Sequence, residues 1–457
     1  MTEFDVFAVL PFAVLGAAAV VTMLLAPLGA HGRVEITAAA GLGLASLIAA
    51  ISYGVPARGL TAMMVDDPAA RLGLVLAALP AMAALSFAPR HPQGREAPAL
   101  IVLAVTGAAI VSAARDGTML FLGLELMSLA LVPLFAFPLG RRGLEAAYKY
   151  FLMSAAGAAT LALGLGLLFA ASGTLAFAGW SAGDALSVLG LVLVLAGLAF
   201  KFALAPFHMW SPDVFEGARP AGAVLVGIAA KVAVGIALLR LTAVLADAAS
   251  LRVGLGLLGG ASIVVGNVLA LRQESLARML GYSSVAHSGY VAAILGSGTP
   301  AADEAALFYL AGYTPALLVA LAVLAVLPRA RRFDSLRGTI LQHPAEGICL
   351  ALAMTSLMGL PPAVGFIGKV YLFSTLVEAQ SWGLLIAAAL GASLGFFYYG
   401  RFLAAPFLPP ASDAEPSLRP RPGRITTAVL LVPTALVLIF GIYPAPLIAV
   451  ASAAAPW

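Results

Sequence analysis

The chain has 457 residues, of which 62% are hydrophobic and only 10% are charged, whereas about 25% of the residues of a soluble domain are charged. This composition, with apolar runs of about 20 residues recurring along the chain and a mean hydropathy of +1.03, excludes a soluble fold and predicts an all-α polytopic membrane protein. The formal net charge of +4 is small for this length and gives no support to nucleic acid as a partner.

Apolar runs between charged or Pro/Gly-rich breaks predict fourteen transmembrane helices. The acidic start MTEFD lacks the basic region of a secretory signal, so the first run is expected to stay as a helix. The run over 345–378 must be interrupted, because GLPPAVGFIG cannot form continuous helix. In chain order the expected helices are 6–28, 35–54, 72–89, 98–114, 117–139, 147–172, 184–206, 217–242, 253–271, 279–296, 305–328, 345–378, 382–405 and 425–450.

The arginines predict the orientation of these helices. Sixteen lie in the odd-numbered connections between helices and five lie on the other side. Positively charged residues accumulate in cytoplasmic loops. We therefore expect the odd connections, including a proline-rich linker around 406–424, in the cytoplasm and both termini outside it. The five exceptions are Arg58, Arg71, Arg115, Arg240 and Arg252.

The four lysines differ from the 21 arginines in position. The arginines mostly mark loops, whereas every lysine lies in or beside an apolar run. A lysine at the centre of a membrane helix costs about 2.5–3.5 kcal/mol on insertion scales, and lysine is the cation whose pKa falls readily on burial. This segregation indicates proton chemistry at Lys149, Lys201, Lys231 and Lys369.

Three charges stand at positions that predict a membrane-embedded ion path. Glu125 is the only charge in its apolar run, so it must be paired or protonated. Lys201 precedes Pro206 by five residues, and the helix should break just beyond the lysine. Lys369 follows GLPPAVGFIG, and paired broken helices mark ion paths in transporters. The alternative for each is a purely structural charge that snorkels, pairs helices or accompanies a kink.

The other three candidate residues, Lys231, His287 and Lys149, have different sequence neighbours. Lys231 has apolar or small neighbours and no helix break, which makes it the hardest charge to explain structurally. His287 is flanked by serines and tyrosines that could carry a water chain, although a histidine that only packs helices is the alternative. Lys149 follows Glu145 by four residues, the spacing of a routine surface pair, so structural and functional roles weigh equally there.

Redox cofactors and metals have no ligand set in this sequence. One cysteine, Cys349, cannot form an internal disulfide, an iron–sulfur cluster or a thiolate zinc site. The five histidines show no spacing typical of metal ligands. Any redox cofactor is therefore expected in another subunit.

Several sequence stretches together carry a family resemblance. They resemble subunit N of the proton-pumping NADH:quinone oxidoreductase, respiratory complex I, within the antiporter-like subunit superfamily. KYF, PFHMW followed by PDVFEGA, and the lysine of GFIGK favour subunit N over its L and M paralogues. ARPAGA after VFEG and Pro315 depart from the family pattern and affect the expected helix geometry there. The stretches, which span residues 123 to 373, are GLELMSL, AAYKYFLMSA, LAFKFALAPFHMWSPDVFEGARP, GNVLALRQESLARMLGYSSVAHSGY and MGLPPAVGFIGKVYLF.

The resemblance implies a fold and residue roles. It implies two inverted five-helix repeats, helices 4–8 and 9–13, with helices 7 and 12 broken. The domains would be 1–97, 98–246, 247–405 and 406–457. Glu125 would pair with Lys201, Lys231 would be the central proton carrier, His287 a connecting group and Lys369 the lysine of the far half, with Lys149 the least certain participant.

The resemblance also implies a proton-translocating subunit in a bacterial inner membrane. It would hold no cofactor itself, while FMN, iron–sulfur clusters, NADH and quinone would bind other subunits. Its partners would be paralogous antiporter-like subunits, small membrane subunits of the same arm and the lipid bilayer. A multi-subunit cation/proton antiporter and a membrane-bound hydrogenase share the Glu and Lys pattern and remain alternatives, as does a scaffold with no ion path.

Overall fold

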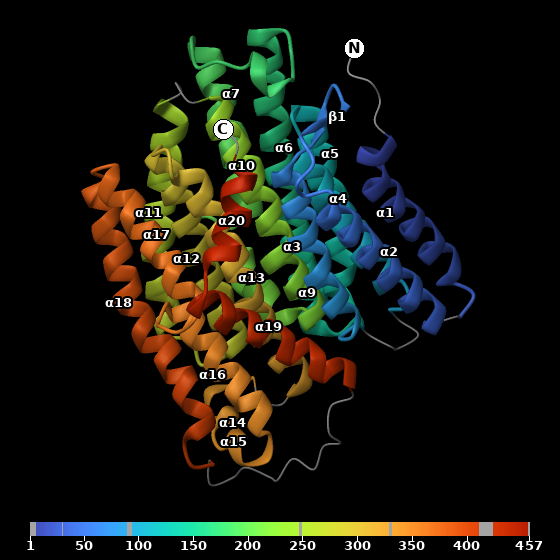
Figure 1. The fold of residues 1–457 in the computed structure, drawn as a ribbon, viewed down its shortest axis with the longest axis vertical. Helices are drawn as coiled ribbons and strands as arrows, with labels where there is room; N and C mark the ends of the chain where they lie inside the picture. The colour runs from blue at the N-terminus through green and yellow to red at the C-terminus, as the bar shows by residue number, and fades with distance from the viewer. Residues whose placement is uncertain are drawn as a thin grey trace.

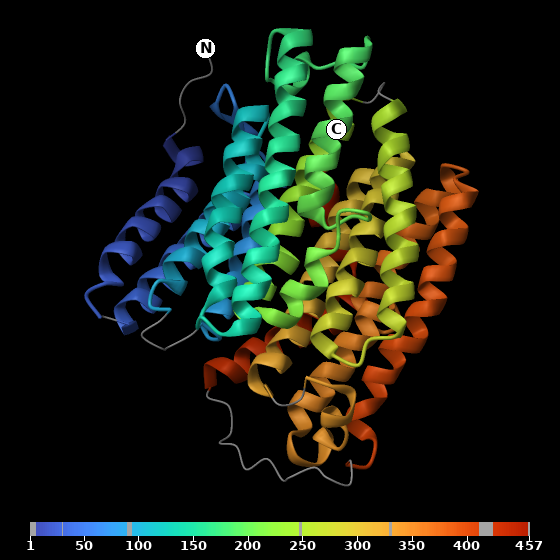
Figure 2. The same ribbon diagram turned by 180° about the vertical axis from the view of Figure 1, so that it is seen from behind.

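The computed structural model describes residues 6–29, 31–88, 94–245, 249–328, 331–410 and 424–455. Both views of the ribbon place α1 and α2 at one side of the molecule and α18 at the other, with most helices following the long axis (Figures 1 and 2). The first helices are α1 (Val6–Leu25), α2 (His31–Ile51), α3 (Pro68–Leu85), α4 (Ala97–Ala113), α5 (Gly117–Ala136), α6 (Arg141–Ser172), α7 (Ala185–Phe202), α8 (Trp210–Gly217), α9 (Pro220–Val224) and α10 (Ala230–Val244). The later ones are α11 (Ala249–Leu271), α12 (Leu276–Ser297), α13 (Ala302–Val326), α14 (Phe333–Leu336), α15 (Thr339–Gln342), α16 (Pro344–Met358), α17 (Val364–Glu378), α18 (Trp382–Ala404), α19 (Arg424–Ile442) and α20 (Ala445–Ala454).

The all-α membrane fold is confirmed, and helix occurs in each of the fourteen predicted ranges. Among the described residues, ten helices are long and apolar enough to cross a membrane, or eleven if the bent pair α19 and α20 is one span. Two shorter apolar helices, α4 and α16, fall below that length. The count of fourteen spans, the inverted repeats and the division into four domains therefore stay predictions.

Both predicted helix breaks are confirmed. The helix α7 ends at Phe202, and Ala203 follows in the left-handed conformation with φ 57°. The helix α16 ends at Met358, and Gly359 follows with φ 80° before α17 begins at Val364. A left-handed residue ends a helix because the chain can no longer make the next intrahelical hydrogen bond. Prolines then keep each segment from resuming the helix at once.

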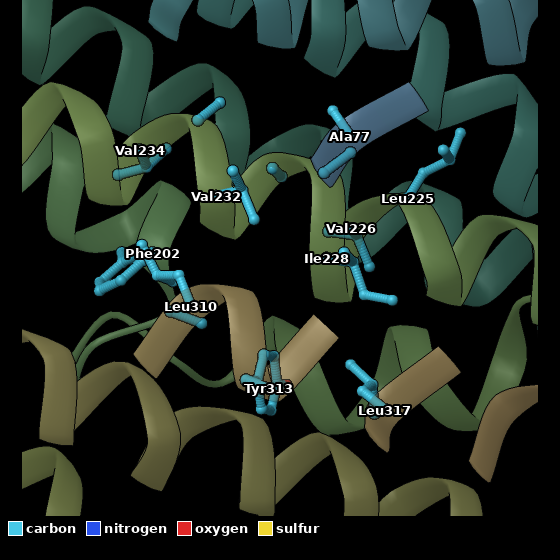
Figure 3. Packing of buried hydrophobic residues seen from close by; sticks show 14 of the residues in the cluster. Ala77, Phe202, Leu225, Val226, Ile228, Val232, Val234, Leu310, Tyr313 and Leu317 are labelled. Atoms are coloured by element: carbon cyan, nitrogen blue, oxygen red, sulfur yellow. The ribbon is translucent and has the colours of Figure 1, made fainter. Parts of the chain in front are cut away.

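Two candidate membrane spans form the centre of the bundle, one made by α13 and the other by α9 and α10 together. All of the apolar window of α13, and all of the window that includes α9 and α10, is buried inside the protein. Figure 3 shows Leu310 of α13 beside Phe202, Tyr313 farther along the same helix, and Val232 and Val234 on the neighbouring α10 ribbon. A π-helical segment, Leu225–Ala229, directly precedes α10. Single π-helical turns frequently occur at functional sites, and this one lies just before Lys231.

A small hairpin at one end of the bundle was not predicted. Its strands β1 (Arg58–Thr61) and β2 (Met64–Asp66) pair antiparallel between α2 and α3. Beside it, Arg71 binds Asp66, and Arg240 of α10 binds Asp67 through two hydrogen bonds of 2.8 and 2.7 Å. Arg71 and Arg240, two of the five arginines outside the expected cytoplasmic loops, are thus buried in ion pairs. Their positions are explained by pairing with a neighbouring aspartate.

The remaining differences from the sequence expectations are local. The helix α13 runs continuously through Pro315, and Pro220 lies in the first turn of α9, where a proline is tolerated. Residues 411–423 of the expected linker lie outside the described residues, as do 1–5 and 456–457 at the termini. The sides of the membrane on which the termini and the linker lie stay predictions.

Candidate functional site

The first buried charge pair joins α5 and α7. Lys201 lies in the last turn of α7, and its Nζ is 3.3 Å from Oε1 of Glu125. It also donates hydrogen bonds to the hydroxyls of Ser128 and Ser154, the latter at 2.7 Å. The lysine side chain is 2% exposed and that of the glutamate is 24% exposed. The lysine is therefore enclosed, whereas the glutamate side chain is partly exposed at the surface of the chain.

Lys231 is held by two backbone carbonyl groups and one hydroxyl group. Its Nζ donates to the backbone carbonyl oxygens of Phe202 and Ser284, each at 3.0 Å, and to the hydroxyl of Ser288. Phe202 is the last residue of α7, so its carbonyl has no partner within the helix. These three acceptors match the three donors of an ammonium group. The sequence showed no partner because two of the three acceptors are backbone atoms.

His287 connects hydroxyl groups from two other helices. Its Nδ1 lies 2.8 Å from the hydroxyl of Tyr309 on α13, and its Nε2 lies 3.0 Å from that of Tyr399 on α18. The hydroxyl of Tyr399 also binds that of Ser283, one turn before the histidine. An imidazole can accept a proton at one nitrogen and release it at the other. This arrangement is suited to proton transfer across α12.

Lys369 lies on α17 and reaches back to the preceding break. Its Nζ donates to the carbonyl oxygen of Met358, the last residue of α16. Among the described residues, no carboxylate forms an ion pair with either Lys231 or Lys369. Both lysines instead bind the carbonyl left free at the end of a broken helix.

Two cavities link these groups. One cavity is lined by Lys231, Ser288 and His287, and a second by His287 and Lys369. Tyr309 and Tyr313 line both. Each cavity has room for about one water molecule. The structure thus places Lys231, His287 and Lys369 around two small adjoining cavities, with His287 in the lining of both.

Lys149 lies apart from this region. Its Nζ forms ion pairs with Glu145 at 2.7 Å and Asp213 at 2.9 Å, and its side chain is 43% exposed. Asp213 also binds Arg278 at 2.6 Å, and Arg278 binds Glu216 at 3.2 Å. Burial raises the pKa of Asp213, but hydrogen bonds from Lys149 and Arg278 outweigh it and hold the pKa below its ordinary value. The five residues form a surface charge cluster that joins α6, α8 and α12.

The described residues contain no group of three or more His, Cys, Asp and Glu side chains able to hold a metal ion. Cys349 is 2% exposed. The candidate site consists instead of ammonium, imidazole, carboxylate and hydroxyl groups, which exchange protons rather than electrons.

Sequence reasoning missed the groups that connect the charges. Ser128 and Ser154 bind Lys201, while Tyr309 and Tyr399 bind His287. A sequence signal was present for Tyr309, since Tyr309 and Tyr313 lie four residues apart on one face of an apolar helix. No local signal distinguished the two serines, because serine commonly bonds to its own helix backbone.

Comparison with known proteins places the chain among subunits of membrane complexes. A family described as NADH:quinone oxidoreductase/Mrp antiporter matches residues 114–395. NADH-quinone oxidoreductase subunit N of Rhodopseudomonas palustris is 46% identical over 456 residues, which is 99% of each chain. A chain of respiratory complex I from Thermus thermophilus with bound aureothin is 31% identical, with a TM-score of 0.85 over 96% of this chain and 98% of the other. A chain of the Mrp complex from Dietzia shares the fold, with a TM-score of 0.87 and 18% identity over 99% and 97% of the chains.

Proposed function

The chain belongs to the subunit N family of NADH-quinone oxidoreductase, and we propose that it translocates protons within the membrane part of that enzyme without carrying electrons. One observation carries this proposal. The cavity lined by Lys231 and the cavity lined by Lys369 share His287, so three proton-exchanging groups lie around two adjoining cavities inside an apolar bundle. Burying such groups is costly in a membrane, which makes a purely structural role a poor explanation for all three.

The Glu125 and Lys201 pair is proposed to control the first step. When the carboxylate lies close, it favours the charged form of the lysine. When the pair separates, the enclosed ammonium loses that support and releases its proton. The difference in exposure between the two side chains supports the glutamate as the partner that moves.

The proton is then proposed to pass by way of Lys231 and His287 to Lys369. Phe202 supports the first transfer, because its carbonyl binds Lys231 while its chain neighbour is Lys201. The paired cavities around His287 support the second transfer. Redox energy released in other subunits would drive the sequence by shifting the Glu125 and Lys201 pair.

The same proposal assigns partners, cofactors and location. The partners are the paralogous antiporter-like subunits and the small membrane subunits of the complex, which lies in a bacterial inner membrane. FMN, iron–sulfur clusters, NADH and quinone bind elsewhere in it. Affinity purification of the tagged chain from its native membrane should recover NADH-oxidising subunits that contain FMN and iron. Recovery of cation antiporter subunits alone would refute this assignment.

The proposed orientation has a direct test at two exposed positions. Ala62 lies in the turn of the β1–β2 hairpin, and Leu341 lies in the connection before α16. Cysteine at position 62 should react with an impermeant maleimide in intact spheroplasts, and cysteine at position 341 only in inverted vesicles. The native Cys349 is buried and gives the background. The reverse pattern would place both termini in the cytoplasm.

A further inference from the structure

The corner between α19 and α20 packs against the non-helical segment between α16 and α17, which precedes Lys369. The two helices meet at an angle of 90°, and Figure 1 shows α19 crossing the bundle before α20 turns along it. Gly441 lies at the end of α19 against the segment between α16 and α17. A Cβ atom added to Gly441 would overlap the carbonyl oxygen of Pro362 and lie 2.7 Å from the Cα of Ala363. Only glycine fits without moving one of the two backbones.

The side chain of Lys369 packs against the same non-helical segment. A Cβ atom at Gly359, where α16 ends, would overlap the Cδ of Lys369 and lie 2.8 Å from its Cε. The lysine crosses this glycine to reach the carbonyl of Met358. Gly365 closes the break from α17, where its backbone N–H donates to the Ser356 hydroxyl at 3.2 Å. The position of the break therefore determines where the lysine finds its acceptor.

We propose that Gly441 is a positioning residue for Lys369. Its contact with Pro362 and Ala363 fixes the break, and the break fixes the Met358 carbonyl that accepts the hydrogen bond from the lysine. A side chain at position 441 pushes this segment away from α19 and disturbs that hydrogen bond. This inference rests on the proposed role of Lys369 in proton transfer and assigns to the α19–α20 corner the task of holding its site in place.

The surroundings of Lys369 make the effect measurable. His287 and Tyr309 line the same cavity, and the ring of Tyr290 lies 5.8 Å from the lysine Nζ. Tyr313 also lines this cavity. These are the titratable groups that face the lysine from α12 and α13. The Gly441 variants change the distance from the lysine to its acceptor and leave the chemical identity of all these groups unchanged.

The test compares Gly441→Ala and Gly441→Val in the assembled complex. The matched control is Gly383→Val on α18, where nothing lies within 4 Å of an added Cβ. Proton pumping and NADH oxidation are measured in vesicles between pH 6 and 9. We expect both Gly441 variants to pump less per NADH, with a larger loss for valine than for alanine, and to have a displaced pH profile. The control should match the unmodified protein.

Two results for Gly441→Ala would overturn the proposal, and a second variant shows which part of it fails. An unchanged pumping ratio and pH profile for assembled Gly441→Ala would overturn it. A reduced amount of complex with an unchanged profile would also overturn it, because that is the result of a structural contact alone. Lys369→Met separates this failure from that of the proposed function. If Lys369→Met pumps normally, the role of the lysine is wrong; if it does not and Gly441→Ala pumps normally, only the positioning role is wrong.

Discussion

The ammonium group of Lys231 lies 3.0 Å from the carbonyl oxygen of Phe202, the last residue of α7. Phe202 directly follows Lys201, so one short piece of backbone contacts the central lysine and carries the lysine that pairs with Glu125. In the second broken helix, Lys369 binds the carbonyl of Met358, which ends α16. Any movement of either break therefore reaches a buried lysine. The following experiments test the consequences.

The pair of Glu125 and Lys201 should behave as one unit. Glu125→Asp keeps the charge with a shorter reach, and it should retain more pumping than Glu125→Gln, which keeps the shape without the charge. The double change Glu125→Gln with Lys201→Met should cost less than the sum of the single changes, because residues that act together are non-additive. The measurement is dye quenching in vesicles that contain fully assembled complex. Strict additivity would show that the two residues do not interact in function.

The hydroxyl of Ser288 should support the charged form of Lys231. A hydrogen bond to a charged group contributes about 1.5–3 kcal/mol, so Ser288→Ala should favour the neutral lysine and slow pumping severalfold. The matched control is Ser393→Ala on α18, since this exposed serine donates only to its own helix at Ala389. Both variants are compared by the initial rate of NADH-driven quenching. Equal rates in the two variants would exclude this support.

Lys149 should matter less than Lys201. Its side chain is 43% exposed and forms ion pairs with Glu145 and Asp213, and exposed pairs contribute only about 0.2–1 kcal/mol. We expect Lys149→Met to retain most of the pumping that Lys201→Met abolishes. Both are measured per NADH oxidised, in complex of verified composition. A loss for Lys149→Met as large as that for Lys201→Met would place the surface cluster within the proton path.

The buried pair of Asp67 and Arg240 should stabilise the protein. Arg240 also donates to the carbonyl of Ser112 at 2.9 Å, so the pair joins α3, α4 and α10. Removing one partner of a buried pair costs about 3–5 kcal/mol because it leaves an uncompensated charge. Arg240→Met should lower the thermal denaturation temperature of the purified complex, and Asp67→Leu added to it should recover part of the loss. Arg219→Met, at an exposed position, is the control. An equal temperature for both arginine variants would contradict this role.

Much of this organisation could be predicted from the sequence. A proline five residues after Lys201 and a GLPP segment before Lys369 predict breaks because proline removes a hydrogen bond wherever it occurs in a helix. The isolation of Glu125 in an apolar run likewise predicts a charged partner. These are local effects, and each depends on one segment of the chain.

The parts that could not be predicted depend on contacts between distant segments. The acceptors of Lys231 include backbone carbonyls of Phe202 and Ser284, and every residue has such a carbonyl. The π-helical segment before it contains the same residue types as the α-helix that follows, so its sequence does not mark it. The close approach of Gly441 to Pro362 joins segments 79 residues apart, and neither segment alone indicates the other.

Protons are proposed to pass through the buried lysines of this chain, and Lys231→Ala removes the lysine between the other two. Among the described residues, this lysine has no ion pair whose loss would leave a charge uncompensated. The variant should therefore assemble. The measurement is the initial rate of NADH-driven dye quenching in vesicles, divided by the rate of NADH oxidation and compared between assembled variant and unmodified complex. We predict a clearly lower ratio for Lys231→Ala, whereas an unchanged ratio would show that pumping does not require this lysine.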